Sequence, residues 1–126
     1  MNLLLHMCCG PCSCYPVKKL REDGIEPEFI KINRVFPLDA EPILTSLRKT
    51  GRLLVVEEAC RTGGVGNSIL TEAAKSGILL KGVRQLDLGS GVIPHGTRYD
   101  LTVRLGMTVE DIENAAKELM NEESAT

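Results

Sequence analysis

The chain has 126 residues, of which 43% are hydrophobic and 25% are charged, and its formal net charge is −2. This composition is typical of one soluble globular domain. The net charge is slightly negative and the basic residues are scattered, so the sequence has no basic tract that would bind nucleic acid or an anionic membrane surface. No apolar run approaches the roughly 18 residues that a membrane helix needs. The opening "MNLLLHMCC" lacks the basic segment of an export signal, so we expect a cytoplasmic protein with reduced thiols.

The first quarter of the sequence predicts a strand, a helix and a second strand. Residues 2–7, "NLLLHM", are almost continuously apolar, which is typical of a buried strand. A helix is expected to follow, with Ser13 as its cap, Pro16 in its first turn and Gly24 at its end. Residues 26–33, "EPEFIKIN", alternate in polarity and predict the second strand. Such a unit implies parallel strands with a right-handed crossover.

The middle of the sequence repeats this alternation. A helix is predicted after Asp39, its expected N-cap, with Pro42 in the first turn and Gly51 as the stop. The clearest strand is residues 52–58, "RLLVVEE", whose unbroken apolar run suits a central strand covered on both faces. A glycine-rich turn then leads to a helix that Asn67 or Ser68 could start.

The last third of the sequence predicts one more strand and two more helices. The strand is expected over residues 79–86, and a loop and a short helix are expected over residues 90–106. The final helix begins at Thr108, which forms an approximate capping box with Asp111. Residues 122–126 are polar and are expected to fray.

Strands that alternate with helices over the whole length predict a three-layer α/β sandwich. We expect a single domain, residues 1–126, around a mostly parallel sheet of about five strands. Aromatic residues are scarce, since the sequence has two Tyr, two Phe and no Trp, so the core should be aliphatic.

Four of the five cysteines are packed into "MCCGPCSCYP", residues 7–16. They follow a predicted strand and precede a helix, at the sheet edge where α/β proteins place ligands. Thiolates there would suit zinc or an iron–sulfur cluster, and the later cysteine also follows a strand. The candidate metal ligands are therefore Cys8, Cys9, Cys12 and Cys60. The alternative, which we favour, is a tight turn with idle, reduced thiols.

A second candidate site is the turn before the middle helix. Its backbone amides could receive phosphate or another anion at the helix N-terminus. The segment lacks the lysine of a phosphate-binding P-loop, and a purely structural turn is the favoured alternative. The residues concerned are Gly63, Gly64, Gly66, Asn67 and Ser68.

The remaining titratable candidates have no clear chemical partner. Glu57 and Glu58 are neighbours on a strand and so face opposite ways, which favours structural roles such as an ion pair with Arg52 or Arg61. His6 is expected to be a packed, hydrogen-bonded core residue. His95 has no nearby nucleophile to activate.

Four ordered blocks carry a resemblance to a known family: "INRVFPLD", "SLRKTGRLLVVEE", "RTGGVGNSI" and "IPHGTRYDLTVRLGMTVEDI". Over about residues 31–119 the chain resembles the C-terminal domain of the transketolase family, and within it the 1-deoxy-D-xylulose-5-phosphate synthases. In such enzymes, the resemblance implies, two preceding domains bind thiamine diphosphate and Mg, and the C-terminal domain chiefly supports the dimer. This chain alone is then expected to hold no cofactor and to be inactive. It would act as a homodimer or as the subunit of a split enzyme.

Residues 1–28 resemble a different family. "LLLHMCCGPCSCYPVKKLREDGIEP" is similar to the start of epoxyqueuosine reductases that carry a Cys-Cys-x-x-Cys motif and an iron–sulfur cluster. We therefore interpret the chain as a chimera joined near Glu28 to Ile32, with a diverged synthase domain as the alternative. A cysteine-based redox module is the competing function.

Overall fold

The structure is a computed structural model that describes residues 3–7, 10–30, 38–57, 64–87 and 108–121, with side chains for all of these except residue 7 and residues 10–15. Its elements are β1 (Leu3–Met7), α1 (Gly10–Glu22), β2 (Pro27–Phe29), α2 (Glu41–Thr50), β3 (Arg52–Val56), α3 (Val65–Lys75), β4 (Gly82–Leu86) and α5 (Val109–Asn121). The expected loop and short helix over residues 90–106 and the tail at 122–126 lie outside the described residues.

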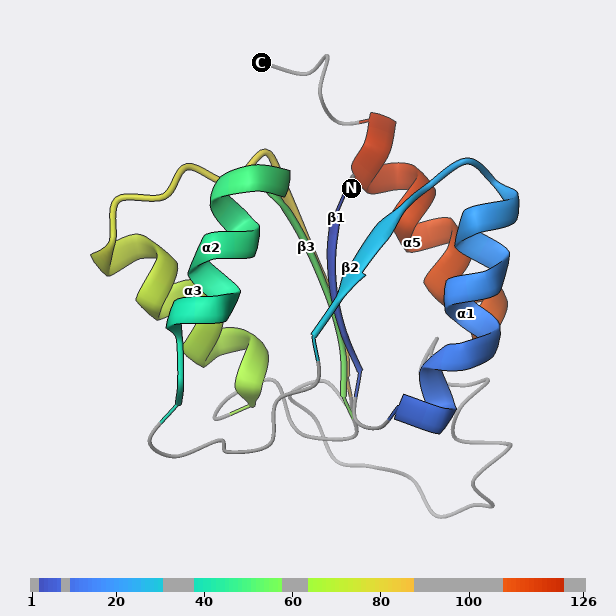
Figure 1. The fold of residues 1–126 in the computed structure, drawn as a ribbon, viewed down its shortest axis with the longest axis horizontal. Helices are drawn as coiled ribbons and strands as arrows, with labels where there is room; N and C mark the ends of the chain where they lie inside the picture. The colour runs from blue at the N-terminus through green and yellow to red at the C-terminus, as the bar shows by residue number, and fades with distance from the viewer. Residues whose placement is uncertain (1–2, 8–9, 31–37, 58–63, 88–107, 122–126) are drawn as a thin grey trace.

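The sheet has the order β2-β1-β3-β4, and every pairing is parallel. The described residues contain four strands, where about five were expected. Figure 1 shows α1 and α5 on one side of this sheet and α2 and α3 on the other. The structure therefore confirms the three-layer, parallel α/β architecture.

Two aliphatic clusters, one on each face of the sheet, form the core. The first joins Leu5 and Leu54 of the strands to Leu20 of α1 and Leu119 of α5. The second includes Leu53 and packs the other face against α2 and α3. All five residues of β3 are buried, as the unbroken apolar run predicted for a strand covered on both faces.

Glycines end two of the helices, as predicted. Gly24 (φ +81°) and Gly51 (φ +69°) take the left-handed conformation that glycine adopts without steric cost. The N–H of Gly51 donates to the Leu47 carbonyl, one of the carbonyl groups in the last turn of α2. The final helix also begins as predicted, since the N–H of Asp111 donates to Thr108 Oγ1 at 3.1 Å.

Three predicted helix starts are wrong. The helix α1 begins at Gly10 rather than Ser13, because Pro11 takes the early position where a missing N–H costs nothing, and Pro16 lies in the helix interior. The helix α2 has Ala40 as its N-cap rather than Asp39 and no side-chain cap. The third, α3, begins at Val65, before the two polar residues expected to start it.

Two strands are shorter than predicted. The strand β2 spans Pro27–Phe29, and the sequence expected to continue it enters residues 31–37, which are not described. The strand β4 begins at Gly82 rather than at residue 79. Leu79 is 93% exposed and belongs to the connection before β4, so its apolar character does not reflect burial in the sheet.

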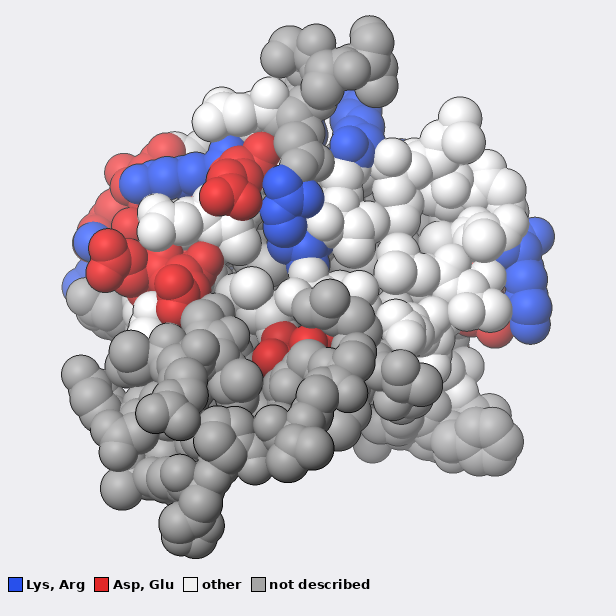
Figure 2. Space-filling model, turned by 180° about the vertical axis from the view of Figure 1, so that it is seen from behind, with Lys and Arg blue, Asp and Glu red and all other residues white. Residues whose placement is uncertain are grey.

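Ion pairs on the helices α1 and α5 mix both signs of charge. Lys117 lies 3.7 Å from Asp23 and 3.7 Å from Glu113, and Lys19 lies 3.9 Å from Glu113. Figure 2 shows the acidic and basic side chains interspersed on this side of the molecule. Such a surface presents no field of a single sign.

Among the described residues, no helix combines the length and the apolar character that crossing a bilayer requires.

Candidate functional site at the carboxyl edge of the sheet

The strand order creates a switch point between β1 and β3. From β1 the chain passes through α1 to β2 on one side, whereas from β3 it passes through α3 to β4 on the other. The helices that follow these two strands lie on opposite faces of the sheet (Figure 1). Open α/β sheets bind ligands in the crevice that such a reversal leaves at the carboxyl ends of the strands. The candidate functional site therefore lies at this edge.

Glu57, the residue after β3, connects the sheet to the helix α3. It is 6% exposed, and its carboxylate accepts hydrogen bonds from the N–H of Val65 at 3.0 Å and of Gly66 at 3.5 Å. Its own N–H donates to the Leu86 carbonyl at the end of β4. These amides belong to the first turn of α3, whose N–H groups have no partner within the helix and whose dipole favours a negative charge. Glu57 therefore caps α3 from the end of β3, the strand that precedes this helix.

This cap bears directly on the predicted anion-binding turn. Of its candidate residues, Gly64, Gly66, Asn67 and Ser68 are described, and Gly63 is not. The chain's own carboxylate lies on the Gly66 amide. Asn67 accepts a hydrogen bond from the side-chain amide of Gln85 at 3.3 Å, and the N–H of Ser68 donates to the Gly64 carbonyl. The anion that the turn binds in this structure is thus a side chain.

His6 lies in β1 beside Val55 of β3, and it is 5% exposed. Its Nδ1 is 3.1 Å from the Ile30 carbonyl, so Nδ1 carries the proton and donates across the sheet edge. Burial lowers the pKa of His6 below the ordinary 6.5, although the hydrogen bond to Ile30 and the negative charge of Glu57 act in the opposite direction. The prediction of a packed, hydrogen-bonded core histidine is confirmed.

The lowered pKa of His6 predicts a stability change in mild acid. The native state keeps His6 neutral where the unfolded chain is already protonated, so stability should fall as pH drops below 6.5 and level off below the folded pKa. Urea unfolding at pH 7.5 and 5.5 would show a larger drop for the wild type than for His6→Gln. Equal drops in the two proteins would contradict this prediction. The other histidine, His95, is present in both proteins, so it does not account for a difference between them.

The candidate metal ligands fall mostly outside what the structure describes. Cys8, Cys9 and Cys60 are among the undescribed residues, and Cys12 is described only as backbone within α1. The strands that precede them are neighbours, since Met7 at the end of β1 pairs with Val56 at the end of β3. No group of three or more His, Cys, Asp or Glu side chains that could hold a metal occurs among the described residues.

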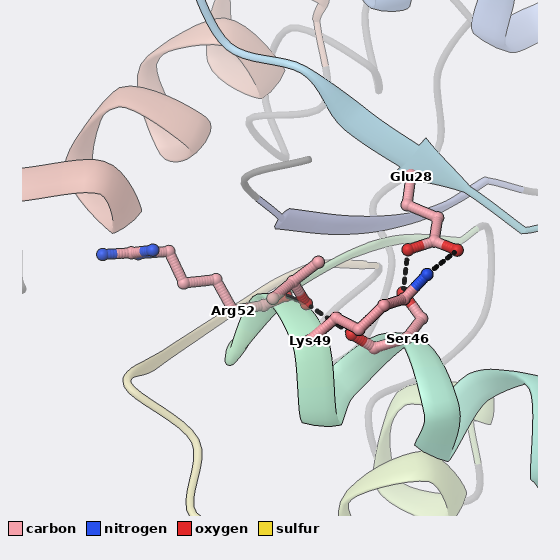
Figure 3. Close-up of polar contacts among 5 residues, drawn as sticks. Glu28, Ser46, Lys49 and Arg52 are labelled. Atoms are coloured by element: carbon pink, nitrogen blue, oxygen red, sulfur yellow. Dashed lines mark hydrogen bonds and ion pairs between the residues drawn. The ribbon is translucent and has the colours of Figure 1, made fainter.

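Two polar side chains of α2 bind a single carboxylate of β2. Glu28 accepts hydrogen bonds from Ser46 Oγ at 3.0 Å and Lys49 Nζ at 3.1 Å (Figure 3). Ser46 is 1% exposed, so this contact fixes the helix against the edge strand. The sequence does not reveal this contact because the partners are 18 and 21 residues apart, and only the alternation of β2 indicates which way Glu28 points.

Arg52 does not share a face of β3 with Glu57, its expected ion partner. Its Nε–H donates to the Leu119 carbonyl of α5 at 3.1 Å, on the opposite side of the sheet from α3. Figure 3 shows its guanidinium pointing away from the contact between Glu28 and Ser46. Arg61 and Glu58 lie outside the described residues, as does His95. Arg52 therefore links the start of β3 to the end of α5.

The order of parallel strands, the helices on both faces and the capped turn after β3 define an α/β domain with a switch-point edge. The chain belongs to the family described as Transketolase, C-terminal domain, whose model matches residues 16–112. This match starts before the junction expected near residues 28–32, so a transketolase-type sequence extends back into α1.

The relatives are much longer than this chain. It is 32% identical over 104 residues to 1-deoxy-D-xylulose-5-phosphate synthase from Gloeobacter violaceus, which covers 82% of this chain and 16% of the synthase. It is 40% identical over 62 residues to the pyruvate dehydrogenase E1 component subunit beta from Staphylococcus aureus, which covers 49% of this chain and 19% of that subunit. The chain therefore spans less than a fifth of these relatives.

A solved structure shows the same fold. The chain described as "Split gene transketolase, inactive beta4 tetramer" superposes with a TM-score of 0.82 at 20% sequence identity. The match covers 97% of this chain and 40% of that one. The shared architecture thus includes the strand and helix that contain the cysteine-rich segment.

Proposed function

We propose that this domain is the C-terminal assembly module of a thiamine-diphosphate-dependent transferase of the 1-deoxy-D-xylulose-5-phosphate synthase type. It works in the cytoplasm, within a homodimer or with a partner chain that carries the other domains. The observation that carries this proposal is the family match over residues 16–112 in a chain that spans 16% of the Gloeobacter violaceus synthase. On this proposal thiamine diphosphate and Mg are bound by the partner domains.

The geometry of the carboxyl edge supports a structural role for two of its buried titratable side chains, Glu57 and His6. Glu57 caps α3, and the Nδ1–H of His6 is committed to the Ile30 carbonyl. Both of these contacts are directed at backbone groups, which they satisfy within the fold. The edge is built to hold a helix and two strands in register.

Complementation of a truncated synthase tests the proposal. The Gloeobacter violaceus synthase lacking the segment that aligns with this chain should be inactive, and adding this chain should restore formation of 1-deoxy-D-xylulose 5-phosphate. This chain alone, with thiamine diphosphate and Mg, should form none. Size-exclusion chromatography should show the two chains co-eluting.

Either of two outcomes would reject the assembly role. Synthase activity of this chain alone would mean that the active site lies within it. Failure to bind or to restore the truncated enzyme, while the intact synthase is active in the same assay, would mean that the domain does not assemble with such partners.

We also propose, as a second function, that the cysteine-rich segment of the N-terminal βαβ unit retains a soft-metal or iron–sulfur site from a different ancestor. The observation in its favour is the pairing of β1 with β3, which brings the strand before Cys8 next to the strand before Cys60. Thiolates from both segments would suit Zn²⁺ or an iron–sulfur cluster. The chimera interpretation and this site stand together, since both rest on "MCCGPCSCYP".

Metal analysis separates this second function from idle thiols. Anaerobically purified protein should contain stoichiometric zinc, or iron with acid-labile sulfide, and the Cys8→Ser/Cys9→Ser/Cys12→Ser variant should contain none. The matched control is Cys14→Ser, which removes a thiol of the same segment outside the proposed ligand set. Metal-free wild-type protein that is as stable as the triple variant would reject the site.

A further inference from the structure

The imidazole of His6 uses one of its two ring nitrogens within the described part of the chain. Its Nδ1–H donates to the Ile30 carbonyl at 3.1 Å, and among the described residues this is the only hydrogen bond of the side chain. A neutral imidazole that is protonated on Nδ1 has a lone pair on Nε2, which can accept a hydrogen bond or bind a metal ion. Nε2 is therefore available to a ligand.

The surroundings of His6 hold its ring in one orientation. The side chain is 5% exposed, and the N–H of Ile30 in turn donates to the Leu5 carbonyl at 3.0 Å, so the group that orients the ring is itself fixed to β1. Metal-binding histidines almost always donate their second ring N–H to a carboxylate or a backbone carbonyl, which fixes the tautomer and directs the other nitrogen at the metal. The contact of His6 with Ile30 is of this kind.

The register of the sheet places this ring at the switch point. His6 pairs with Val55 of β3, and Val55 belongs to the cluster that packs against α2 and α3. Because side chains two residues apart along a strand share a face, Glu57 belongs to this face as well, and its carboxylate contacts the start of α3. His6 is the last residue but one of β1. Its ring therefore lies at the carboxyl edge where open α/β sheets bind ligands.

The sequence provides sulfur ligands after the same two strands. Cys8 directly follows β1, and Cys60 comes shortly after Val56, the last residue of β3. Imidazole nitrogen and thiolate sulfur are donors that zinc prefers, whereas Mg²⁺ and Ca²⁺ take oxygen ligands. The described residues contain no group of three side chains that could hold a metal, so thiolates from these two segments are needed to complete a site with His6.

We propose that Nε2 of His6 is a ligand of a zinc ion bound at the switch point, together with thiolates from the segments that follow β1 and β3. This inference rests on the second function proposed above and deepens it, because it adds a nitrogen ligand to a set of cysteines and selects the metal. Four-coordinate sites of histidine and cysteine are typical of structural zinc, whereas iron–sulfur clusters are held mainly by cysteines. The Ile30 carbonyl positions the ligand by accepting the hydrogen bond from Nδ1.

Titration of the metal-free full chain with Co²⁺ under anaerobic conditions tests the proposal. Co²⁺ is the probe because it occupies tetrahedral zinc sites and its visible and near-ultraviolet absorption reports its ligands. The test variant is His6→Asn, whose side-chain amide can donate near the position of Nδ1 but has no atom at Nε2. It should bind Co²⁺ about tenfold more weakly or worse, since changing groups that only orient a ligand already costs about that much. The near-ultraviolet thiolate band should remain, and the visible bands should shift.

His95→Asn is the matched control, because it makes the same substitution at the other histidine of the sequence. Its affinity for Co²⁺ and its spectrum should equal those of the wild type. Circular dichroism checks that His6→Asn is folded. If it is not, His6→Cys takes its place, and this variant should bind Co²⁺ with a stronger thiolate band because a sulfur ligand replaces the nitrogen.

The outcomes separate this inference from the second function on which it rests. Equal Co²⁺ affinity and equal spectra for the wild type and the His6 variant would overturn the role of His6 and leave a site made of cysteines. Iron with acid-labile sulfide that His6→Asn retains in full would overturn the zinc site in favour of a cluster. Wild-type protein that takes up neither Co²⁺ nor Zn²⁺ would reject the second function and this inference together.

Discussion

Replacing Leu54 with alanine should lower the free energy of unfolding by about 2–5 kcal/mol. Leu54 is 0% exposed and lies in β3, which has strands on both sides and helices on both faces. Its side chain packs in the cluster formed with α1 and α5. The strand cannot move to fill the space without breaking its pairing with β1 and β4, so a cavity remains and adds to the lost burial.

Urea unfolding followed by circular dichroism measures this effect, and Leu79→Ala is the matched control. Leu79 has the same side chain but is 93% exposed, so its truncation should change the unfolding free energy by less than about 0.5 kcal/mol. Similar losses for the two variants would mean that Leu54 is not in the core. A loss for Leu54→Ala below about 1 kcal/mol would mean that the sheet relaxes around it.

The sequence was most informative where one local rule decides the structure. The apolar run in β3 required cover on both faces, the two glycines at φ +81° and +69° ended helices, and Thr108 with Asp111 started α5. In each case the determining atoms lie within a few residues of one another. The layer architecture followed from the alternation of such elements.

The sequence was least informative where a distant group replaces a local signal. Asn67 and Ser68 were reasonable helix starts by residue type, yet α3 begins at Val65 because Glu57 supplies its cap from eight residues earlier. The contact of Glu28 with Ser46 likewise depends on how α2 lies across β2. Strand alternation gives the direction of one side chain, but the packing of helices on the sheet decides which partner it meets.

These distant contacts also change how the candidate site is interpreted. A glycine-rich turn before a helix predicts an anion site whenever its amides are open. Here the anion is Glu57. Burial lowers the pKa of His6, and the negative charge of the same Glu57 carboxylate acts against this lowering. At the switch-point edge, His6 and Glu57 therefore make contacts that hold the sheet and α3 together, which agrees with the proposed assembly role.

Replacing Glu57 with alanine should destabilise the domain by about 1–3 kcal/mol, although it removes no large apolar side chain. The N–H groups of Val65 and Gly66 would lose their acceptor at a buried helix end, and α3 would lose a negative charge at its N-terminus. Glu57→Gln keeps one acceptor oxygen without the charge, so its loss should be about half as large. Urea unfolding measures both variants.

Glu72→Ala is the matched control for this prediction, because Glu72 lies on the same helix and contacts Lys75 at 3.8 Å on its surface. Its loss should stay below about 1 kcal/mol, as for other surface ion pairs. Hydrogen exchange adds a local measurement, since the amides of Val65 and Gly66 should exchange faster in Glu57→Ala and remain protected in Glu72→Ala. Equal stability of the two alanine variants, with unchanged exchange at Val65, would show that α3 holds its start without the carboxylate.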